Sequence, residues 1–111
     1  MPERGEVWLE RPARDLIGHE QLGQRPVVVV SGDAINAGWP LAVVVPLTRR
    51  DRGMALHVVL DPPDGGLRYR SVALVEQIRA VDHTRLVERW GRVSASTMRE
   101  VDDRLRLVLD L

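Results

Sequence analysis

The apolar residues of this 111-residue chain fall into short runs that are separated by polar turns. Several runs alternate with polar residues or are rich in β-branched residues, which is typical of strands. The pattern predicts strands at residues 6–10, 27–30, 41–47 and 56–60 and a longer one at 71–81. Glycine, proline and aspartate mark the turns between them. Short strands joined by polar turns predict a small curled barrel.

Three of these strands carry features that restrict their place in the sheet. The run 27–30 is four valines without alternation, so we expect it to be buried on both faces. Pro46 in the third strand indicates a bulge or an edge near the end of that strand. Glu76 and Gln77 interrupt the last run, so one of them meets a buried face and needs a partner there.

One helix is expected, at the C-terminal end of the chain. Ser94 is a suitable N-cap. Apolar side chains then recur at helical spacing and would pack on the barrel, namely Met98, Val101, Leu105 and Val108 or Leu109. The pairs Glu100–Arg104 and Asp102–Arg106 have the acid-first i, i+4 spacing of an exposed, charged helix face. The fold class expected is therefore mainly β with a C-terminal α-helix.

Two connecting segments also bear on function. Residues 11–24 are polar and contain Pro12, Gly18 and Gly23, which predicts a loop of about 14 residues. Loops of that length in a compact domain are usually functional or disordered, so this one is a candidate lid over a site. Residues 32–40 are expected to form a turn region.

Composition narrows the classes of protein. A chain of 111 residues fits one domain, 1–111, and its 44% hydrophobic and 29% charged residues are ordinary for a globular protein. The absence of cysteine excludes disulfides and thiolate chemistry, and no apolar run is long enough for a membrane span, so we expect a cytoplasmic protein. All 16 basic positions are arginine and the net charge is zero, so any nucleic-acid site must be a local patch.

A set of short blocks resembles the MazF/PemK family of toxin endoribonucleases. The blocks are Arg4-Gly5-Glu6-Val7-Trp8, Gly23-Gln24-Arg25-Pro26, Val45-Pro46-Leu47-Thr48, Glu76-Gln77-Ile78-Arg79 and Gly91-Arg92-Val93-Ser94. Their order and spacing run nearly end to end. The resemblance implies an SH3-like barrel of the CcdB/PemK (MazF) type. It also implies a homodimer, a MazE-like antitoxin as partner, single-stranded RNA as substrate, and no cofactor.

The resemblance implies that Arg25 and Thr48 are catalytic. From position alone, Arg25 could equally be a surface arginine paired with Glu20. The chemistry implied is attack of a ribose 2′-OH on the adjacent phosphate, which leaves a 2′,3′-cyclic phosphate and a 5′-OH and which only RNA allows. A neutral arginine base would need a pKa shift of about 5 units, or roughly 7 kcal/mol. We therefore expect Arg25 to be an electrostatic clamp and a proton donor, with Thr48 orienting the phosphate.

Other residues are candidates for the base and for RNA contacts. Glu20 is the candidate base on the 2′-OH, and a solvated loop carboxylate is the alternative. The candidate RNA-binding residues are His19, Gln21, Arg49, Glu76, Gln77 and Arg79. Arg49 departs from the serine that is common in the family, and could instead be a solvated turn residue. Arg79 is expected on the same face as Gln77 and could hold a phosphate or pair with Asp82.

No metal site is expected. His19, His57 and His83 lie in a predicted loop, strand and turn without the short spacing of metal ligands. His57 is expected to point outward from its strand. Trp39 could stack a base from the turn region. Trp8 and Trp90 are expected in the core or at a subunit contact.

Two other functions are compatible with the same sequence. The related CcdB toxins share the barrel but poison DNA gyrase by protein binding, which would not need Arg25 and Thr48. A degenerate family member would only bind RNA or an antitoxin.

Overall fold

The computed structural model describes residues 1–12 and 24–111. Within these ranges the chain forms strands, two α-helices and three short 3-10 helices, labelled η. In chain order they are β1 (Glu6–Glu10), β2 (Arg25–Val29), α1 (Asp33–Gly38), β3 (Leu41–Thr48), β4 (Val58–Leu60), η1 (Asp64–Gly66), β5 (Ser71–Ala73), η2 (Val75–Gln77), β6 (Arg79–Asp82), η3 (His83–Arg85), β7 (Leu86–Arg92) and α2 (Ala95–Leu109). The expected class, mainly β with a C-terminal helix, is confirmed.

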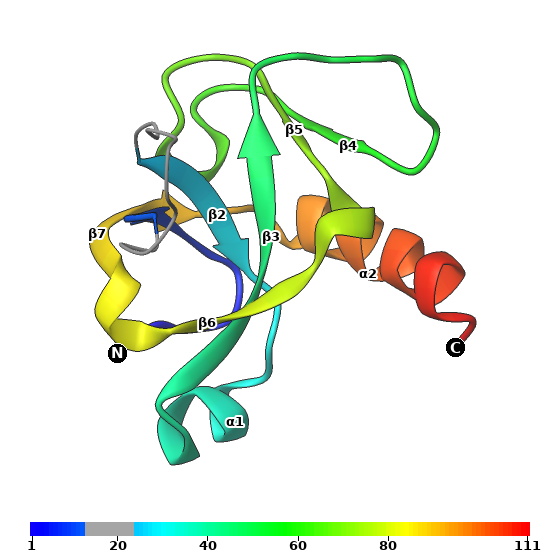
Figure 1. The fold of residues 1–111 in the computed structure, drawn as a ribbon. Helices are drawn as coiled ribbons and strands as arrows, with labels where there is room; N and C mark the ends of the chain where they lie inside the picture. Colours follow the sequence, from blue (N-terminus) through cyan, green and yellow to red (C-terminus); the bar gives the residue numbers. More distant parts are fainter. Residues whose placement is uncertain (13–23) are drawn as a thin grey trace, which may run out of the picture.

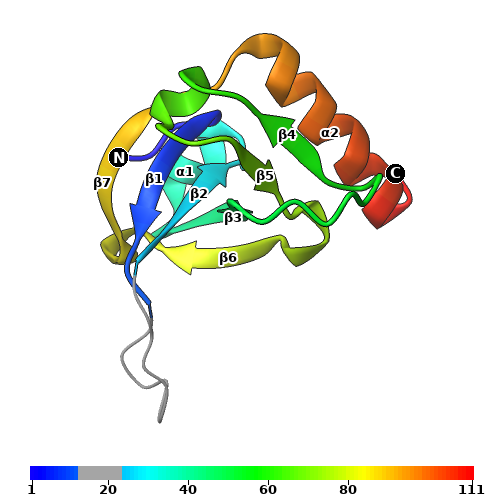
Figure 2. The same cartoon turned by 90° about the horizontal axis from the view of Figure 1, so that it is seen from above.

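The strands form one strongly curled antiparallel sheet. Its strand order is β4-β5-β3-β2-β1-β7. The remaining strand, β6, pairs with the first half of β3, on the same edge as β5. Figure 1 shows β3 running through the middle of the fold, and Figure 2 shows the strands curling around it with α2 on the outside. The helix packs against β4 and η2.

Two apolar clusters fill the fold, and each uses one face of β2. Val28 belongs to the larger cluster, which α2 covers with Val101 and with the partly buried Met98. Val27 and Val29 belong to the smaller cluster on the other face, which Trp8 covers. All three valines are at most 1% exposed. The prediction of a strand buried on both faces is therefore confirmed.

The predicted strand at 71–81 is wrong, because the chain forms β5, η2 and β6 there instead. The reason is that β3 has two partners on one edge. Its first half pairs with β6 and its last two residues pair with β5. The chain crosses between them at η2, where Leu74 N donates to Pro46 O at 2.9 Å. The turn buries Val75 and leaves Glu76 and Gln77 at the surface.

Pro46 sits at this interruption of the ladder on β3. The β6 pairing ends at Val44 and the β5 pairing starts at Leu47. Proline has no N–H to donate, so a position without a strand partner on that edge suits it. The expected irregularity near the end of this strand is therefore present.

Two smaller expectations also need correction. The region 32–40 contains α1, whose Asn36 is buried and donates to Ser31 O at 3.0 Å. The strand expected at 56–60 begins only at Val58, because His57 N donates to Met54 O in a turn just before it.

The helix α2 begins as predicted, with Ser94 as its N-cap accepting from Thr97 N. The expected i, i+4 ion pairs on its surface are replaced by other contacts. Asp102 pairs with Arg4 near the N-terminus of the chain, and Arg106 pairs with Asp103 at 2.9 Å. Tertiary contacts therefore decide the partners of these charges.

Candidate active site

Arg25 and Thr48 lie at the same end of two neighbouring strands. Arg25 is the first residue of β2 and Thr48 is the last residue of β3. In the antiparallel ladder between these strands, Val27 is opposite Pro46. Continuing this register by two residues puts Arg25 opposite Thr48, and residues directly opposite each other point to the same face of a sheet. The structure thus brings the strand ends that carry the two predicted catalytic residues together, two residues beyond the last pair of the ladder, and their catalytic role stays a prediction.

The two side chains differ in burial and in hydrogen bonding. Arg25 is exposed and Thr48 is half-buried. The Thr48 Oγ1 atom accepts a hydrogen bond from Arg50 N at 3.2 Å. A hydroxyl that accepts in this way keeps its own O–H to donate. Thr48 is therefore oriented by the turn that follows it and has a donor available for an anion.

A hollow of about 600 Å³ opens beside Thr48. Among the described residues, its lining includes Arg49, Arg68 and Arg89 and one acid, Glu88. The Arg49 guanidinium lies over the ring of Tyr69, 4.2 Å from the ring centroid. Tyr69 is 60% exposed, so the ring is only partly covered. The hollow therefore combines positive charge with an aromatic surface, which are the two features that single-stranded nucleic acid binds.

One wall of the hollow depends on a close approach between η1 and β7. Gly66 has φ +74°, and a Cβ built on it would lie 2.1 Å from Trp90 O. Only glycine combines this backbone conformation with this approach. The turn signal at Gly65-Gly66 in the sequence therefore shapes the wall of the hollow.

A buried glutamate holds two arginines next to Arg25. The Glu10 side chain is 2% exposed and pairs with Arg79 and Arg85. The Arg79 Nη1 donates to Glu10 Oε2 at 2.8 Å, while its Nη2 donates to Oε1. The hydrogen bonds to this carboxylate raise the pKa of Arg79, against the opposite effect of its burial. The proposed pairing of Arg79 with Asp82 is thus wrong, and Arg79 is fixed by Glu10 on β1.

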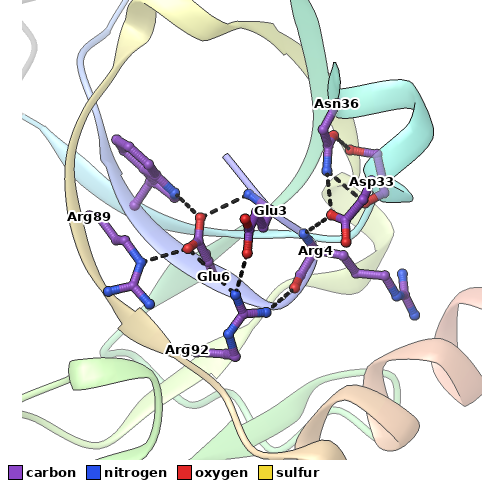
Figure 3. Close-up of polar contacts among 9 residues, drawn as sticks. Glu3, Arg4, Glu6, Asp33, Asn36, Arg89 and Arg92 are labelled. Carbon is purple, nitrogen blue, oxygen red and sulfur yellow. Dashed lines mark hydrogen bonds and ion pairs between the residues drawn. The ribbon is translucent and has the colours of Figure 1, made fainter. Parts of the chain in front are cut away.

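A second buried glutamate on β1 ties that strand to β7, as Figure 3 shows. The Glu6 carboxylate accepts from Arg89 Nε at 2.6 Å and from Trp8 Nε1 at 3.0 Å. Arg92 lies near it and donates to Glu3 at 2.6 Å. Burial would raise the pKa of Glu6, but these donors and the Glu3 backbone N–H outweigh it and lower the pKa. Glu6 therefore stays charged and positions Arg89 at the hollow.

Glu76 and Gln77 are not in a strand, so the expectation that one of them interrupts a buried face is wrong. Both are exposed in η2, and Glu76 Oε1 lies 3.0 Å from His57 Nε2. His57 is buried, contrary to the outward position expected for it. Burial would raise the pKa of Glu76, but its backbone N–H and His57 outweigh that effect and lower it. Gln77 lies in η2 and Arg79 in β6, so the two residues do not share a strand face as expected.

The other residues named from the sequence are residues 19–21 of the predicted loop and the three tryptophans. His19, Glu20 and Gln21 lie outside the described residues. Trp39 is 62% exposed just after α1, while Trp8 and Trp90 pack against the two apolar clusters as expected. Within residues 1–12 and 24–111, no group of three or more His, Cys, Asp or Glu residues could hold a metal ion. None of the helices in the described ranges is long and apolar enough to span a bilayer.

Sequence reasoning missed Glu10, Arg85, Arg68, Tyr69 and Arg89. A signal existed for Glu10, because β1 alternates and places Glu6, Trp8 and Glu10 on one face. An acid that shares a strand face with an aromatic residue packed on the core is drawn toward burial and then needs a cationic partner. Tyr69 and Arg68 carry no such signal, since they follow a turn and reach the hollow only through the fold.

The sequence of this chain matches known proteins over nearly its whole length. A family model described as PemK-like, MazF-like toxin of type II toxin-antitoxin system matches residues 3–109. The chain belongs to this family. It is 40% identical to Endoribonuclease MazF9 of Mycobacterium tuberculosis, over 100% of this chain and 98% of the relative. It is 34% identical to Endoribonuclease EndoA of Bacillus subtilis, over 98% of this chain and 95% of the relative.

A solved structure also resembles this MazF-like chain. It is an endoribonuclease from Mycobacterial species in complex with its cognate antitoxin, with a TM-score of 0.83 and 26% identity over 100% of this chain and 97% of that chain. The MazF/PemK resemblance and the fold expected from it are thereby confirmed. The alternative of a CcdB-like toxin is not favoured by these matches.

Proposed function

We propose that this MazF-like protein is the toxin of a type II toxin–antitoxin pair and a sequence-specific endoribonuclease that cuts single-stranded RNA without a metal ion. The observation that carries the proposal is that Arg25 and Thr48 stand at the same end of the paired strands β2 and β3, where Thr48 lines the positively charged hollow. Relatives named endoribonucleases, at 34–40% identity over nearly the whole chain, support it.

The reaction proposed needs only the RNA and side chains. The 2′-OH loses its proton and attacks the adjacent phosphorus, and the bond from phosphorus to the 5′-oxygen breaks. The 5′-oxygen takes up a proton, so the products are a 2′,3′-cyclic phosphate and a 5′-OH. Negative charge builds on the equatorial oxygens during the attack, so a fixed guanidinium there stabilises the transition state more than the ground state.

Each candidate residue has a role in this scheme. Arg25 is the electrostatic clamp on the phosphate and donates the proton to the leaving oxygen. Thr48 orients the phosphate through its O–H, which the hydrogen bond from Arg50 N leaves available. Glu20 is the base on the 2′-OH.

The hollow and the segments near it supply RNA contacts. Arg49 and Tyr69 offer a charged and aromatic surface next to Thr48. Gln77 is exposed in η2 and is proposed to contact base edges, with Glu76 beside it. His19, Gln21 and Arg79 complete the proposed RNA-binding set.

The proposed assembly is a homodimer, inhibited by a MazE-like antitoxin and acting in the cytoplasm as one toxin domain, 1–111. A chain with zero net charge and a local arginine-rich surface suits an acidic segment of such an antitoxin. A related endoribonuclease from Mycobacterial species is known in complex with its cognate antitoxin, which supports this partner.

The experiment is cleavage of a long RNA of mixed sequence in EDTA by the wild-type protein and by Arg25→Ala and Thr48→Val. Arg106→Ala is the matched control, because Arg106 is an exposed arginine on α2 that pairs with Asp103. We expect discrete cuts by the wild type and the control, and a rate lower by about 10²- to 10³-fold for Arg25→Ala.

Three results would contradict the proposal. Equal cleavage by Arg25→Ala would place the chemistry elsewhere. Cleavage that needs added Mg²⁺ would remove the metal-independent mechanism. Intact RNA with the wild type, across substrates of varied sequence and structure, would make the protein a binding member of the family.

A further inference from the structure

Glu10, Arg79 and Arg85 form a cluster, called the Glu10 cluster below, that holds more positive charge than neutralising the buried carboxylate requires. A buried carboxylate needs a cationic partner, and one guanidinium in bidentate geometry satisfies both of its oxygens. Glu10 has two, because Arg85 Nη2 also donates to its Oε2 at 2.8 Å. The three groups therefore carry a net positive charge around a carboxylate that is 2% exposed.

The cluster lies on the same face of the sheet as Arg25. In the β1–β2 ladder Glu10 is directly opposite Arg25. Side chains directly opposite each other have Cβ atoms about 4.5–5.5 Å apart. The Glu10 oxygens are occupied by Arg79 and Arg85, so the charge of Arg25 adds to the net positive charge of this corner.

Both arginines keep donors for a ligand. Each guanidinium has five N–H donors. Arg79 uses two for Glu10, and Arg85 uses one for Glu10 and one, through Nε, for Arg11 O at 3.1 Å. Within the described ranges the other donors have no acceptor in the protein. The Arg79 and Arg85 side chains are 37% and 30% exposed, so their unused donors reach the surface. The buried Glu10 carboxylate fixes the orientation of both guanidinium planes.

We propose that Glu10 is a positioning residue that holds Arg79 and Arg85 as a fixed pair for an RNA phosphate next to the one bound at Arg25. This rests on the proposed endoribonuclease function. A planar guanidinium that is already oriented loses less side-chain entropy when it binds a phosphate than a free one does. Glu10 does not touch RNA in this arrangement and acts only through the two arginines.

A charge-neutralising substitution separates positioning from simple electrostatics. Glu10→Gln removes one negative charge from beside an anion site. If only the local charge mattered, the variant would bind RNA more tightly. If Glu10 positions the arginines, the variant binds more weakly, because an amide provides one acceptor oxygen and turns an NH₂ group toward the guanidiniums.

The experiment measures binding and cleavage separately. Binding is measured with an RNA that carries 2′-deoxy at the cut nucleotide, over a range of salt concentrations, and kcat and KM are measured with the cleavable RNA. We expect Glu10→Gln to bind about tenfold more weakly and to raise KM more than it lowers kcat. Arg85→Gln should lower the slope of log K against log salt by about 0.7, the value for one phosphate contact on a single strand.

Asp102→Asn is the control. It removes the ion pair that Asp102 of α2 makes with Arg4, and it should leave the salt slope unchanged. Arg85→Lys keeps the charge without the planar fork, so it should restore most of the slope but not the affinity. Thermal unfolding of each variant shows that the protein measured is folded.

The outcomes separate this inference from the proposed function. The inference is overturned if Glu10→Gln binds RNA as tightly as the wild type or more tightly, or if folded Arg85→Gln has an unchanged salt slope. In either case the proposed function still stands if the wild-type protein cleaves RNA. A wild-type protein that cleaves no RNA, yet shows the expected losses of affinity and slope, overturns the proposed function and supports the phosphate site.

Discussion

Replacing Arg25 with lysine tests whether the guanidinium acts as a fixed clamp or only as a positive charge. Arg25 is the first residue of β2, where it pairs with Glu10 of β1, and it stands at the same end of the sheet as Thr48, the last residue of β3. A lysine there keeps one positive charge but replaces a planar fork of five donors by a flexible ammonium. Only the interactions that depend on the fork are lost.

The size of the effect follows from that difference. Removal of one fixed donor to a developing oxyanion lowers kcat by about 10²- to 10³-fold. Arg25→Lys retains the charge, so we expect a smaller loss of about 10- to 100-fold in kcat, which corresponds to roughly 1.4–2.7 kcal/mol. KM should change little, because the clamp acts mainly on the transition state.

The pH profile provides a second readout. Arginine stays protonated to above pH 12, whereas an ordinary lysine has a pKa of about 10.4. The cleavage rate of Arg25→Lys should therefore fall above about pH 9.5, where that of the wild type is not limited by this group. Single-turnover cleavage of a short RNA between pH 6 and 10.5 measures both effects. A rate close to that of the wild type, with an unchanged profile, would refute the clamp.

Other predictions test the fold and the hollow. The pKa of Glu6 is lower in the folded protein than its ordinary value of 4.5. The charged Glu6 therefore contributes stability that is fully present above pH 4.5 and is lost as the pH falls through the lower folded pKa. In urea titrations, Glu6→Gln should flatten the decline of the unfolding free energy below pH 4.5. Gly66→Ala should destabilise the protein by at least about 2 kcal/mol more than Gly53→Ala in the same assay. Both glycines have positive φ, but only at Gly66 does a Cβ meet a backbone atom, Trp90 O at 2.1 Å, so equal losses would contradict the close approach. Tyr69→Ala should weaken binding of a 2′-deoxy-blocked RNA by about 1–3 kcal/mol while Tyr69→Phe retains it, and equal affinities would exclude stacking on this ring.

Much of the fold was predictable because local chemistry and tertiary structure agree there. The valine run at 27–30 has no polar face, and its first three residues are buried on both sides of β2. Ser94 caps α2, and the apolar positions of that helix at Met98 and Val101 face the core. In both cases, the side-chain pattern alone determines the environment that the element needs.

The break at residues 71–81 was not predictable, because its cause lies elsewhere in the chain. No glycine or proline marks the run, and its apolar residues suit a continuous strand. The chain turns at η2 because β3 offers pairing positions to two different strands on one edge. Local sequence does not contain this information.

The candidate site was predicted in part. Arg25 and Thr48 were identified by their blocks, and the pairing of β2 with β3 brings the strand ends that carry them together. Glu10 and Arg85 were missed because their relation depends on the closure of the barrel, which brings β1 against β7 and η3. The hollow at Tyr69 was missed for the same reason, since it lies between segments that are distant in sequence.

The most direct test of the central claim is the chemistry of the RNA ends left by the wild-type protein in EDTA. The account predicts a 2′,3′-cyclic phosphate and a 5′-OH at each cut, and no cut at a site where the ribose before the scissile bond is 2′-deoxy. A 5′-phosphate end, or cleavage after the 2′-deoxy nucleotide, would mean that the nucleophile is not the 2′-OH and would contradict the account.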